Sequence, residues 1–80
     1  MEDKIKSVLA AVFGIDQNEI SDESSYETIA SWDSLTHMNM ISALEETFEV
    51  HFEDEEILEM INFRSVRETV QAKVSGLVMA

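Results

Sequence analysis

No proline and only two glycines interrupt the eighty residues of this chain. Proline ends helices and glycine weakens them, so a sequence almost free of both favours long helices over the strands and tight turns of a β architecture. A chain of this length has room for one hydrophobic core. We therefore predict an all-α fold in a single domain that covers residues 1–80.

The first helix is predicted over residues 2–13. Five apolar residues there are spaced for one helical stripe: Ile5, Val8, Leu9, Val12 and Phe13. Gly14 follows at the position where a helix C-cap adopts a positive φ. The next segment, residues 15–33, is polar and lacks a sustained period. We predict a long loop, either functional or containing a short helical turn, whose apolar residues pin it across the bundle: Ile15, Ile20, Tyr26 and Ile29.

Capping residues and apolar spacing predict three further helices. A second helix over residues 34–49 follows Asp33, a suitable N-cap. A short third helix over residues 54–60 is expected to be capped by Asp54, with these apolar residues turned inward: Ile57, Met60 and Ile61. A fourth is expected to be capped by Ser65, with one apolar face formed by Val66, Val70, Val74 and Leu77. The pattern predicts a four-helix bundle with a long loop between helices one and two and a short third helix.

The second predicted helix has two unequal faces. At about 100° per residue, one sector collects a core-facing stripe: His37, Met40, Ile41, Leu44 and Phe48. The opposite side collects two apolar residues among polar and acidic ones: Leu35, Met38, Ser42, Glu45, Glu46 and Glu49. Single exposed apolar side chains are ordinary on protein surfaces, and the alternative is an apolar partner contact ringed by carboxylates.

The formal net charge is −12, and no lysine or arginine occurs between Ser7 and Phe63. Nucleic acid is excluded as a partner because phosphate backbones require a basic surface, and anionic membranes are disfavoured for the same reason. The acidic centre is expected either to bind basic patches on partner proteins or simply to keep a small domain in solution.

Lys4 and Lys6 precede an apolar run that loosely resembles a signal peptide. The run is short, acids flank it on both sides, and no segment is long and apolar enough to span a bilayer. We expect no membrane insertion and a cytoplasmic location.

Metal binding and intrinsic catalysis have little support in the sequence. Neither acidic stretch has the central glycine of an EF-hand loop, and His37 and His51 show no ligand pattern. The absence of cysteine excludes disulfides, thiolate metal sites and a cysteine nucleophile. Ser34 lacks a nucleophile elbow, and its nearest base in sequence, His37, is expected to face the core. We predict no metal site and no enzymatic activity.

The start of the second predicted helix resembles the acyl carrier protein family, through the segment Trp32-Asp33-Ser34-Leu35-Thr36-His37-Met38. Asp-Ser-Leu alone is weak evidence, because aspartate caps many helices. Its setting is more specific: an amphipathic first helix, a long acidic loop, Ala-Leu-Glu-Glu-Thr-Phe at residues 43–48, an acidic short helix and a fourth helix. The resemblance covers nearly the whole chain and implies a discrete, monomeric carrier.

This resemblance implies that a phosphopantetheinyl transferase attaches 4′-phosphopantetheine from coenzyme A to Ser34, and that the thiol of this arm carries acyl groups as thioesters. A phosphodiester at a helix N-terminus meets free backbone N–H groups and the positive end of the helix dipole. Asp33 is implied as part of the surface that the transferase recognises. Partners with basic surfaces, including acyl-loading, condensing and acyl-transferring enzymes, are expected to bind Asp33, Leu35, Met38, Glu45, Glu46 and Glu49.

The sequence departs from the commonest fatty-acid carriers of this family. Ala30 and Ser31 stand where Leu-Gly is usual, and Thr36 and Asn39 are uncharged where acids are frequent. These differences favour a dedicated pathway, such as specialised metabolite, polyketide-like or surface-polysaccharide acylation, over housekeeping fatty-acid synthesis. An aminoacyl or peptidyl carrier of the same fold is the first alternative, and an unmodified acidic helical adaptor is the second.

Overall fold

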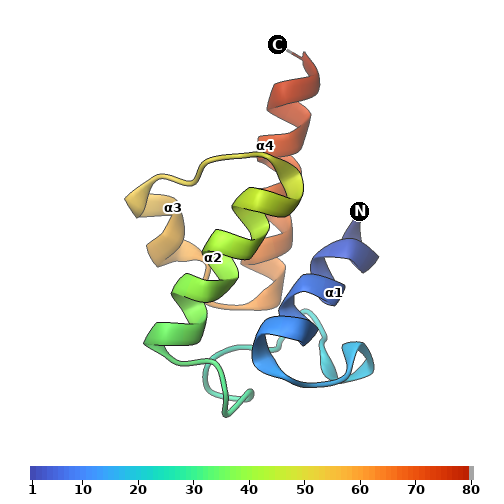
Figure 1. The fold of residues 1–80 in the computed structure, drawn as a ribbon, viewed down its shortest axis with the longest axis vertical. Coiled ribbons are helices and arrows are strands. Elements are labelled where there is room, and N and C mark those ends of the chain that lie inside the picture. The colour runs from blue at the N-terminus through green and yellow to red at the C-terminus, as the bar shows by residue number, and fades with distance from the viewer. Residues whose placement is uncertain (80) are drawn as a thin grey trace.

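The structure, a computed structural model, describes the backbone of residues 1–79 and the side chains of residues 1–76. Its elements are α1 (Glu2–Phe13), a short 3-10 turn η1 (Gln17–Glu19), α2 (Ser34–Phe48), α3 (Asp54–Glu59) and α4 (Phe63–Met79), arranged as Figure 1 shows. Residues 1–79 form no strand, and one isolated antiparallel bridge joins Ser25 to Asn62. The predicted four-helix bundle, with its long loop and short third helix, is confirmed.

The first two helices end where the backbone turns left-handed. Gly14 has φ 68°, and its N–H donates to the carbonyl of Ala10, as predicted for the end of the first helix. Glu49 has φ 54° and donates to the carbonyl of Glu45, so α2 ends at Phe48, one residue before the predicted end. The loop after α1 contains η1, which agrees with the expectation of a short helical turn in a connection of this length.

The predicted caps of the last two helices were wrong. Glu53, not Asp54, precedes α3, and its N–H donates to the Glu56 carboxylate at 2.8 Å. Asn62 precedes α4, and its side-chain oxygen accepts from the backbone N–H of Ser65 at 2.8 Å. Asparagine caps as well as serine does, so α4 begins at Phe63, two residues before the serine that we predicted as its cap.

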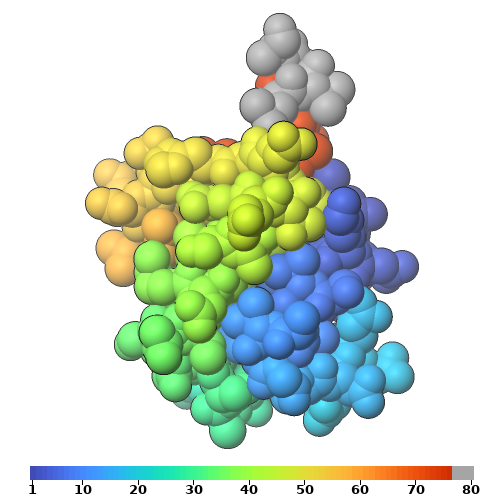
Figure 2. Space-filling view, viewed as in Figure 1, coloured from blue at the N-terminus to red at the C-terminus, as the bar shows by residue number. Residues whose placement is uncertain are grey.

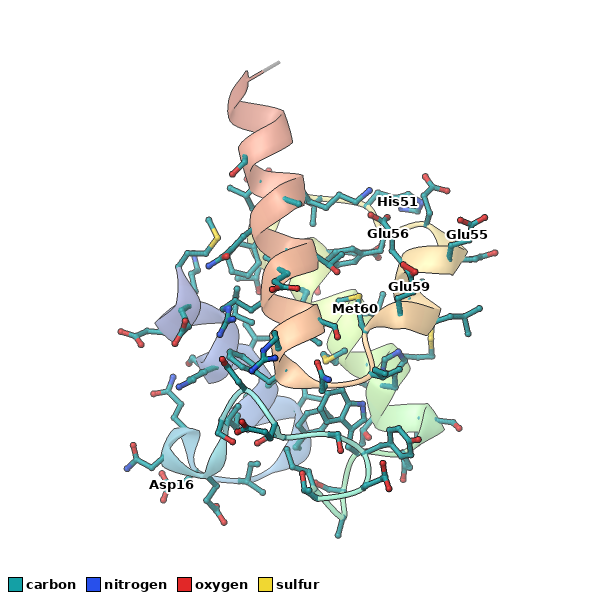
Figure 3. All side chains as sticks on the ribbon, turned by 180° about the vertical axis from the view of Figure 1, so that it is seen from behind. Asp16, His51, Glu55, Glu56, Glu59 and Met60 are labelled. Carbon is teal, nitrogen blue, oxygen red and sulfur yellow. The ribbon has the colours of Figure 1, made fainter. Side chains whose placement is uncertain are left out.

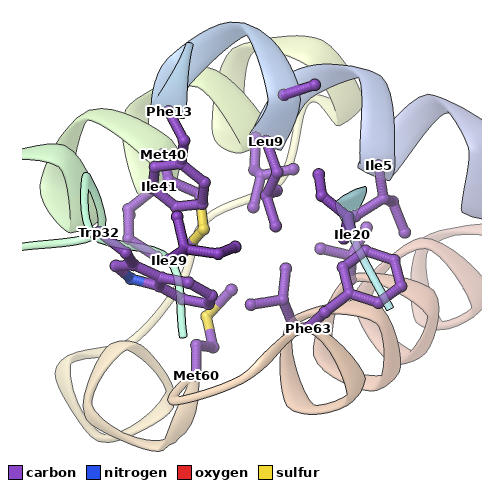
Figure 4. Packing of buried hydrophobic residues seen from close by; sticks show 14 of the residues in the cluster. Ile5, Leu9, Phe13, Ile20, Ile29, Trp32, Met40, Ile41, Met60 and Phe63 are labelled. Carbon is purple, nitrogen blue, oxygen red and sulfur yellow. The ribbon is translucent and has the colours of Figure 1, made fainter. Parts of the chain in front are cut away.

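The core draws on α1, α2, α4, the long loop and the segments that flank α3, and Ile57 of α3 packs against it (Figure 4). Its fully or almost fully buried apolar residues are Ile5, Leu9, Ala10, Phe13, Ile20, Ile29, Trp32, Met40, Ile41, Leu44, Phe52, Met60, Phe63, Val66 and Val70. The predicted inward stripe of α2 is confirmed, with His37 and Phe48 half-buried at its two ends. The loop is pinned by its buried Ile20, Ile29 and Trp32.

Two apolar residues that we expected inside lie outside. Tyr26 is 57% exposed and Ile61 is 53% exposed, so neither pins its segment to the core. Val74 packs against the core as predicted, whereas the side chain of Leu77 lies outside the described residues.

Polar contacts fasten the long loop to α1 and α4. Arg67 of α4 donates to the Asp22 carboxylate, which raises the pKa of the guanidinium above its ordinary value. Next to this pair, the N–H of Phe63 donates to the carbonyl of Ser24 at 2.8 Å. At the other end of the loop, the Ser31 hydroxyl donates to the carbonyl of Phe13 at 2.8 Å. These contacts therefore fix the path of the loop up to the start of α2.

The two faces of α2 predict opposite responses to truncation. Ile41→Ala and Leu44→Ala remove side chains that are buried in the core, and each should lower the free energy of unfolding by about 2–5 kcal/mol. Leu35→Ala, on the exposed face, should change it little. Urea denaturation of the three variants measures the difference. Equal losses in all three would mean that the faces of α2 are assigned wrongly.

Candidate functional site

Ser34 is the first residue of α2, and hydrogen bonds on both sides of it fix its position. The Asp33 carboxylate accepts from the backbone N–H of Thr36 at 2.9 Å, and the N–H of Asp33 donates to the Thr36 hydroxyl oxygen at 2.9 Å. The Thr36 hydroxyl in turn donates to the carbonyl of Ser31. This reciprocal cap ties the loop to the first turn of the helix, with the predicted N-cap in place.

The Asp33 carboxyl stays charged in this setting to lower pH than a free aspartate would. The backbone N–H of Thr36, and after it the Thr36 hydroxyl, lower the pKa of Asp33 below its ordinary value of 3.8. Hydrogen bonds to the ionised form favour that form, and the positive end of the helix dipole acts in the same direction.

The Ser34 side chain is exposed, and its hydroxyl makes no hydrogen bond to any side chain or carbonyl among the described residues. Two serines of the loop have engaged hydroxyls: Ser24 is buried and accepts from the N–H of Ser21, and Ser31 donates to the carbonyl of Phe13. Ser42, on the same helix, is exposed but lies in mid-helix. Ser34 therefore combines a free hydroxyl with a helix N-terminus.

A groove of about 480 Å³ opens beside Ser34, between the loop, the first turns of α2, and α3. Its walls are formed by Tyr26, Trp32, Asp33, Ser34, His37, Met38, Ile57, Leu58, Met60 and Ile61. The volume falls within the range of roughly 300–1,000 Å³ that is typical of small-molecule sites. Most of these walls are apolar, so the groove suits an apolar group held close to Ser34.

A hydrogen-bonded chain of side chains lies in the wall of this groove. The indole N–H of Trp32 donates to Nδ1 of His37 at 3.1 Å, and Nε2 of His37 lies 2.9 Å from the carbonyl oxygen of Ile57. Trp32 also stacks on Phe13, with the ring centroids 4.8 Å apart. The expectation that His37 turns inward is confirmed, and the contacts show that it joins the loop to α3.

The apolar residues that we expected at a partner contact lie on the surface of α2. Leu35 is 71% exposed and Met38 is 49% exposed. In the view of Figure 2, α2 lies uncovered between α1 and α3. Glu46, on the same helix, and Glu49, which follows its C-terminal end, are exposed and make no ion pair with a lysine or arginine among residues 1–76.

Glu45 is tied to the fold in a way that its neighbour Glu46 is not. Its carboxylate accepts from the backbone N–H of Phe52 at 2.9 Å and lies 3.5 Å from Nδ1 of His51. Phe52 is buried in the core, so Glu45 holds the segment between α2 and α3.

Acids also gather along α3, where Figure 3 labels Glu55, Glu56 and Glu59. Glu56 is paired with Lys73 at 2.8 Å. The backbone N–H of Glu53, and after it Lys73, lower the pKa of Glu56 below its ordinary value.

Within the described residues, no three His, Cys, Asp or Glu side chains are placed to hold a metal ion. None of the helices that the structure describes is both long and apolar enough to cross a membrane.

Two comparisons with known proteins bear on this geometry. A family model described as a phosphopantetheine attachment site matches residues 3–72. The chain is also similar to a holo acyl carrier protein from Geobacter metallireducens, whose solution structure superposes with a TM-score of 0.88 at 28% sequence identity. That match covers 98% of this chain and 90% of the other. The chain belongs to the acyl carrier protein family.

Family membership settles the class of molecule and its cofactor. Acyl carrier proteins are carriers and not enzymes, and this carrier bears a covalently attached 4′-phosphopantetheine. Its partners are a phosphopantetheinyl transferase and acyl-handling enzymes. The exposed, unbonded Ser34 hydroxyl beside an open apolar groove fits such a group, since nothing in the described structure blocks the approach to it.

Sequence reasoning missed the rim of the carrier's groove. We expected Tyr26 and Ile61 inside and gave Leu58 no role, yet Leu58 is 78% exposed and all three line the groove. One signal was available: Ile57, Leu58, Met60 and Ile61 crowd one short segment, and a single buried face cannot take them all.

The lowered pKa of Asp33 predicts how the carrier responds to acid. The charged cap should stabilise the folded state fully above pH 3.8, and this contribution should be lost as pH falls through the lower folded-state value. Asp33→Asn keeps a capping oxygen but cannot titrate. We therefore expect the difference in unfolding free energy between wild type and Asp33→Asn to shrink in acid.

Urea denaturation of both proteins from about pH 7 to about pH 2 measures this difference. The other carboxyl groups are common to both proteins and cancel. A difference that stays constant down to the lowest pH would contradict the ionised cap.

Proposed function

We propose that Ser34 is the residue that carries the phosphopantetheine arm, and that the chain presents acyl thioesters to partner enzymes in a dedicated biosynthetic pathway. The observation that carries this proposal is the free Ser34 hydroxyl at the N-terminus of α2, next to a groove with apolar walls. When bound, the arm supplies a thiol on which an acyl group is held as a thioester.

The chain's own residues prepare the hydroxyl and orient it. In the transfer, the Ser34 oxygen forms a bond to the β-phosphorus of coenzyme A, the bond from that phosphorus to the 3′,5′-ADP oxygen breaks, and the hydroxyl proton passes to a base of the transferase. The Asp33–Thr36 cap holds the first turn so that the oxygen faces solvent. The N-terminus of α2 favours the phosphodiester charge that results.

The proposed partner surface is the exposed side of α2, made up of Asp33, Leu35, Met38, Glu45, Glu46 and Glu49. Two apolar side chains ringed by carboxylates offer a partner both an apolar contact and a charge pattern that a basic surface complements. Glu45 also accepts a hydrogen bond from the backbone N–H of Phe52, so a substitution of Glu45 would disturb the fold as well as the surface. Glu46 is therefore the better residue with which to test the proposed surface.

A dedicated pathway is supported by the uncharged residues in the first turns of α2. Thr36 is part of the cap, and Asn39 is exposed where fatty-acid carriers of this family frequently have acids. Family membership favours this carrier reading over the unmodified acidic adaptor. An aminoacyl or peptidyl carrier has the same arm, and the mass of the loaded protein from its native host separates it from an acyl carrier.

The attachment site predicts a simple mass experiment. Wild-type protein incubated with coenzyme A and a phosphopantetheinyl transferase should gain the mass of one arm, and Ser34→Ala should gain none. Ser42→Ala, which removes an exposed serine from the middle of the same helix, is the matched control and should gain one arm. Modification of the Ser34→Ala protein would move the site elsewhere.

The partner surface predicts a charge-specific loss of binding. Glu46→Lys should weaken association with the transferase without lowering the unfolding midpoint, and the wild-type affinity should itself fall as salt rises, because exposed charges are screened over roughly 8–10 Å near physiological ionic strength. Glu68→Lys on α4 changes the net charge equally and should leave the affinity near the wild-type value. Equal weakening by both substitutions would indicate an effect of net charge and not of this surface.

A further inference from the structure

His37 occupies a place that the attachment of the arm does not explain. It lies in α2 with its ring half-buried in the wall of the groove, between an indole from the loop and a backbone carbonyl from α3. Trp32 is buried, and its N–H reaches Nδ1 of His37 at 3.1 Å. Nε2 of His37 reaches the carbonyl oxygen of Ile57 at 2.9 Å. One side chain therefore joins the end of the long loop, α2 and the more distant α3.

The two partners determine which nitrogen of His37 carries the proton. An indole N–H only donates, so Nδ1 must accept. A carbonyl only accepts, so Nε2 must donate. Both bonds exist together only in the neutral ring with its proton on Nε2. Both ring nitrogens of His37 are therefore occupied, and the ring cannot bond a further polar partner.

The bridge matters because α3 has few other attachments. This helix has six residues and makes only sparse backbone contact with any one of the other helices. Besides His37, it is held by half-buried Ile57, which packs against the core, by buried Met60 just beyond its C-terminal end and by the ion pair of Glu56 with Lys73. Met60 lies in the core near Trp32 and Met40, so the inner end of the groove is closed by packed apolar side chains (Figure 4).

The groove lies on one side of this bridge, and the packed core lies on the other. Its rim is apolar and open to solvent, and consists of Tyr26, Met38, Leu58 and Ile61. Beyond the bridge lies the packed core, which an apolar chain can enter only if α3 moves away from α2. Such a movement must break the bond from His37 to Ile57.

We propose that His37 is a positioning residue that limits how much of the cargo the carrier can shelter. While His37 bridges Trp32 and Ile57, the cargo is confined to the outer groove, so short acyl groups are covered and the far end of a long chain stays in water. This inference rests on Ser34 carrying the arm, since Ser34 lines the same groove. It identifies short acyl groups as the cargo that this carrier suits.

The test measures how well the thioester is sheltered as the cargo grows. Acetyl, butyryl, hexanoyl, octanoyl and dodecanoyl arms are installed with the transferase and the matching acyl coenzyme A, and intact mass verifies one loaded arm per molecule. Hydroxylamine then cleaves the thioester, and the rate is read for each chain length. Failure of the wild type to load would count against Ser34 as the attachment site, whereas the proposal about His37 is decided by the rates of loaded protein.

In the wild type, the rate should fall over the shortest chains and then level off. His37→Ala removes the bridge, so its rate should keep falling for the longer chains, ending roughly tenfold below the wild type for dodecanoyl, as expected if about two further methylenes are buried. Asn39→Ala, an exposed neighbour outside the groove, is the control and should keep the wild-type profile. A merely structural loss would shift all chain lengths together.

His37→Phe keeps the bulk of the ring but makes neither hydrogen bond, and it serves if the alanine variant does not fold. Its rate of cleavage by hydroxylamine should also keep falling for the longer acyl chains and not level off. A wild-type profile in both variants would overturn the proposal. A change in the alanine variant alone would also overturn it, because the volume of the ring and not its hydrogen bonds would then set the limit.

Discussion

The burial of Trp32 is the contact on which the arrangement of the site depends. The indole stacks on Phe13 at the end of α1, is almost fully buried, and donates to His37 one turn into α2. A large aromatic ring with a satisfied N–H is a strong anchor, because it combines apolar burial with a directional bond. The two residues that follow, Asp33 and Ser34, are consequently forced outward at a defined point, and the helix starts there.

From this anchor, neighbouring positions acquire separate roles. Thr36 uses its backbone N–H and hydroxyl in the cap. His37 points inward to α3, and Met38 is exposed to solvent. Because successive residues of a helix differ in direction by about 100°, one turn can hold a cap, an internal bridge and an exposed apolar contact without conflict. The Ser34 hydroxyl is left free because Asp33 and Thr36 make the hydrogen bonds that cap the helix.

What the sequence could predict follows from the range of the interactions involved. The start of α2, its two faces and the Gly14 cap depend on residues within a turn or two, and all were predicted correctly. The exposure of Tyr26 and Ile61 and the bridge from His37 to Ile57 depend on where α3 packs, which no local pattern encodes. The role of Ser34 was suggested by resemblance and stays a prediction.

The acidity of the exposed side of α2 results from where the few cations are used. Of the five lysines and arginines, Arg64 and Arg67 pair with Asp22, Lys6 pairs with Glu2, Lys73 pairs with Glu56, and Lys4 lies over the Phe48 ring. Most of these contacts fasten the loop, α1 or α3 to a neighbouring part of the fold. The carboxylates of Glu46 and Glu49 are therefore left without a lysine or arginine partner among residues 1–76. The internal pairing of the cations thus leaves the proposed partner surface on α2 acidic.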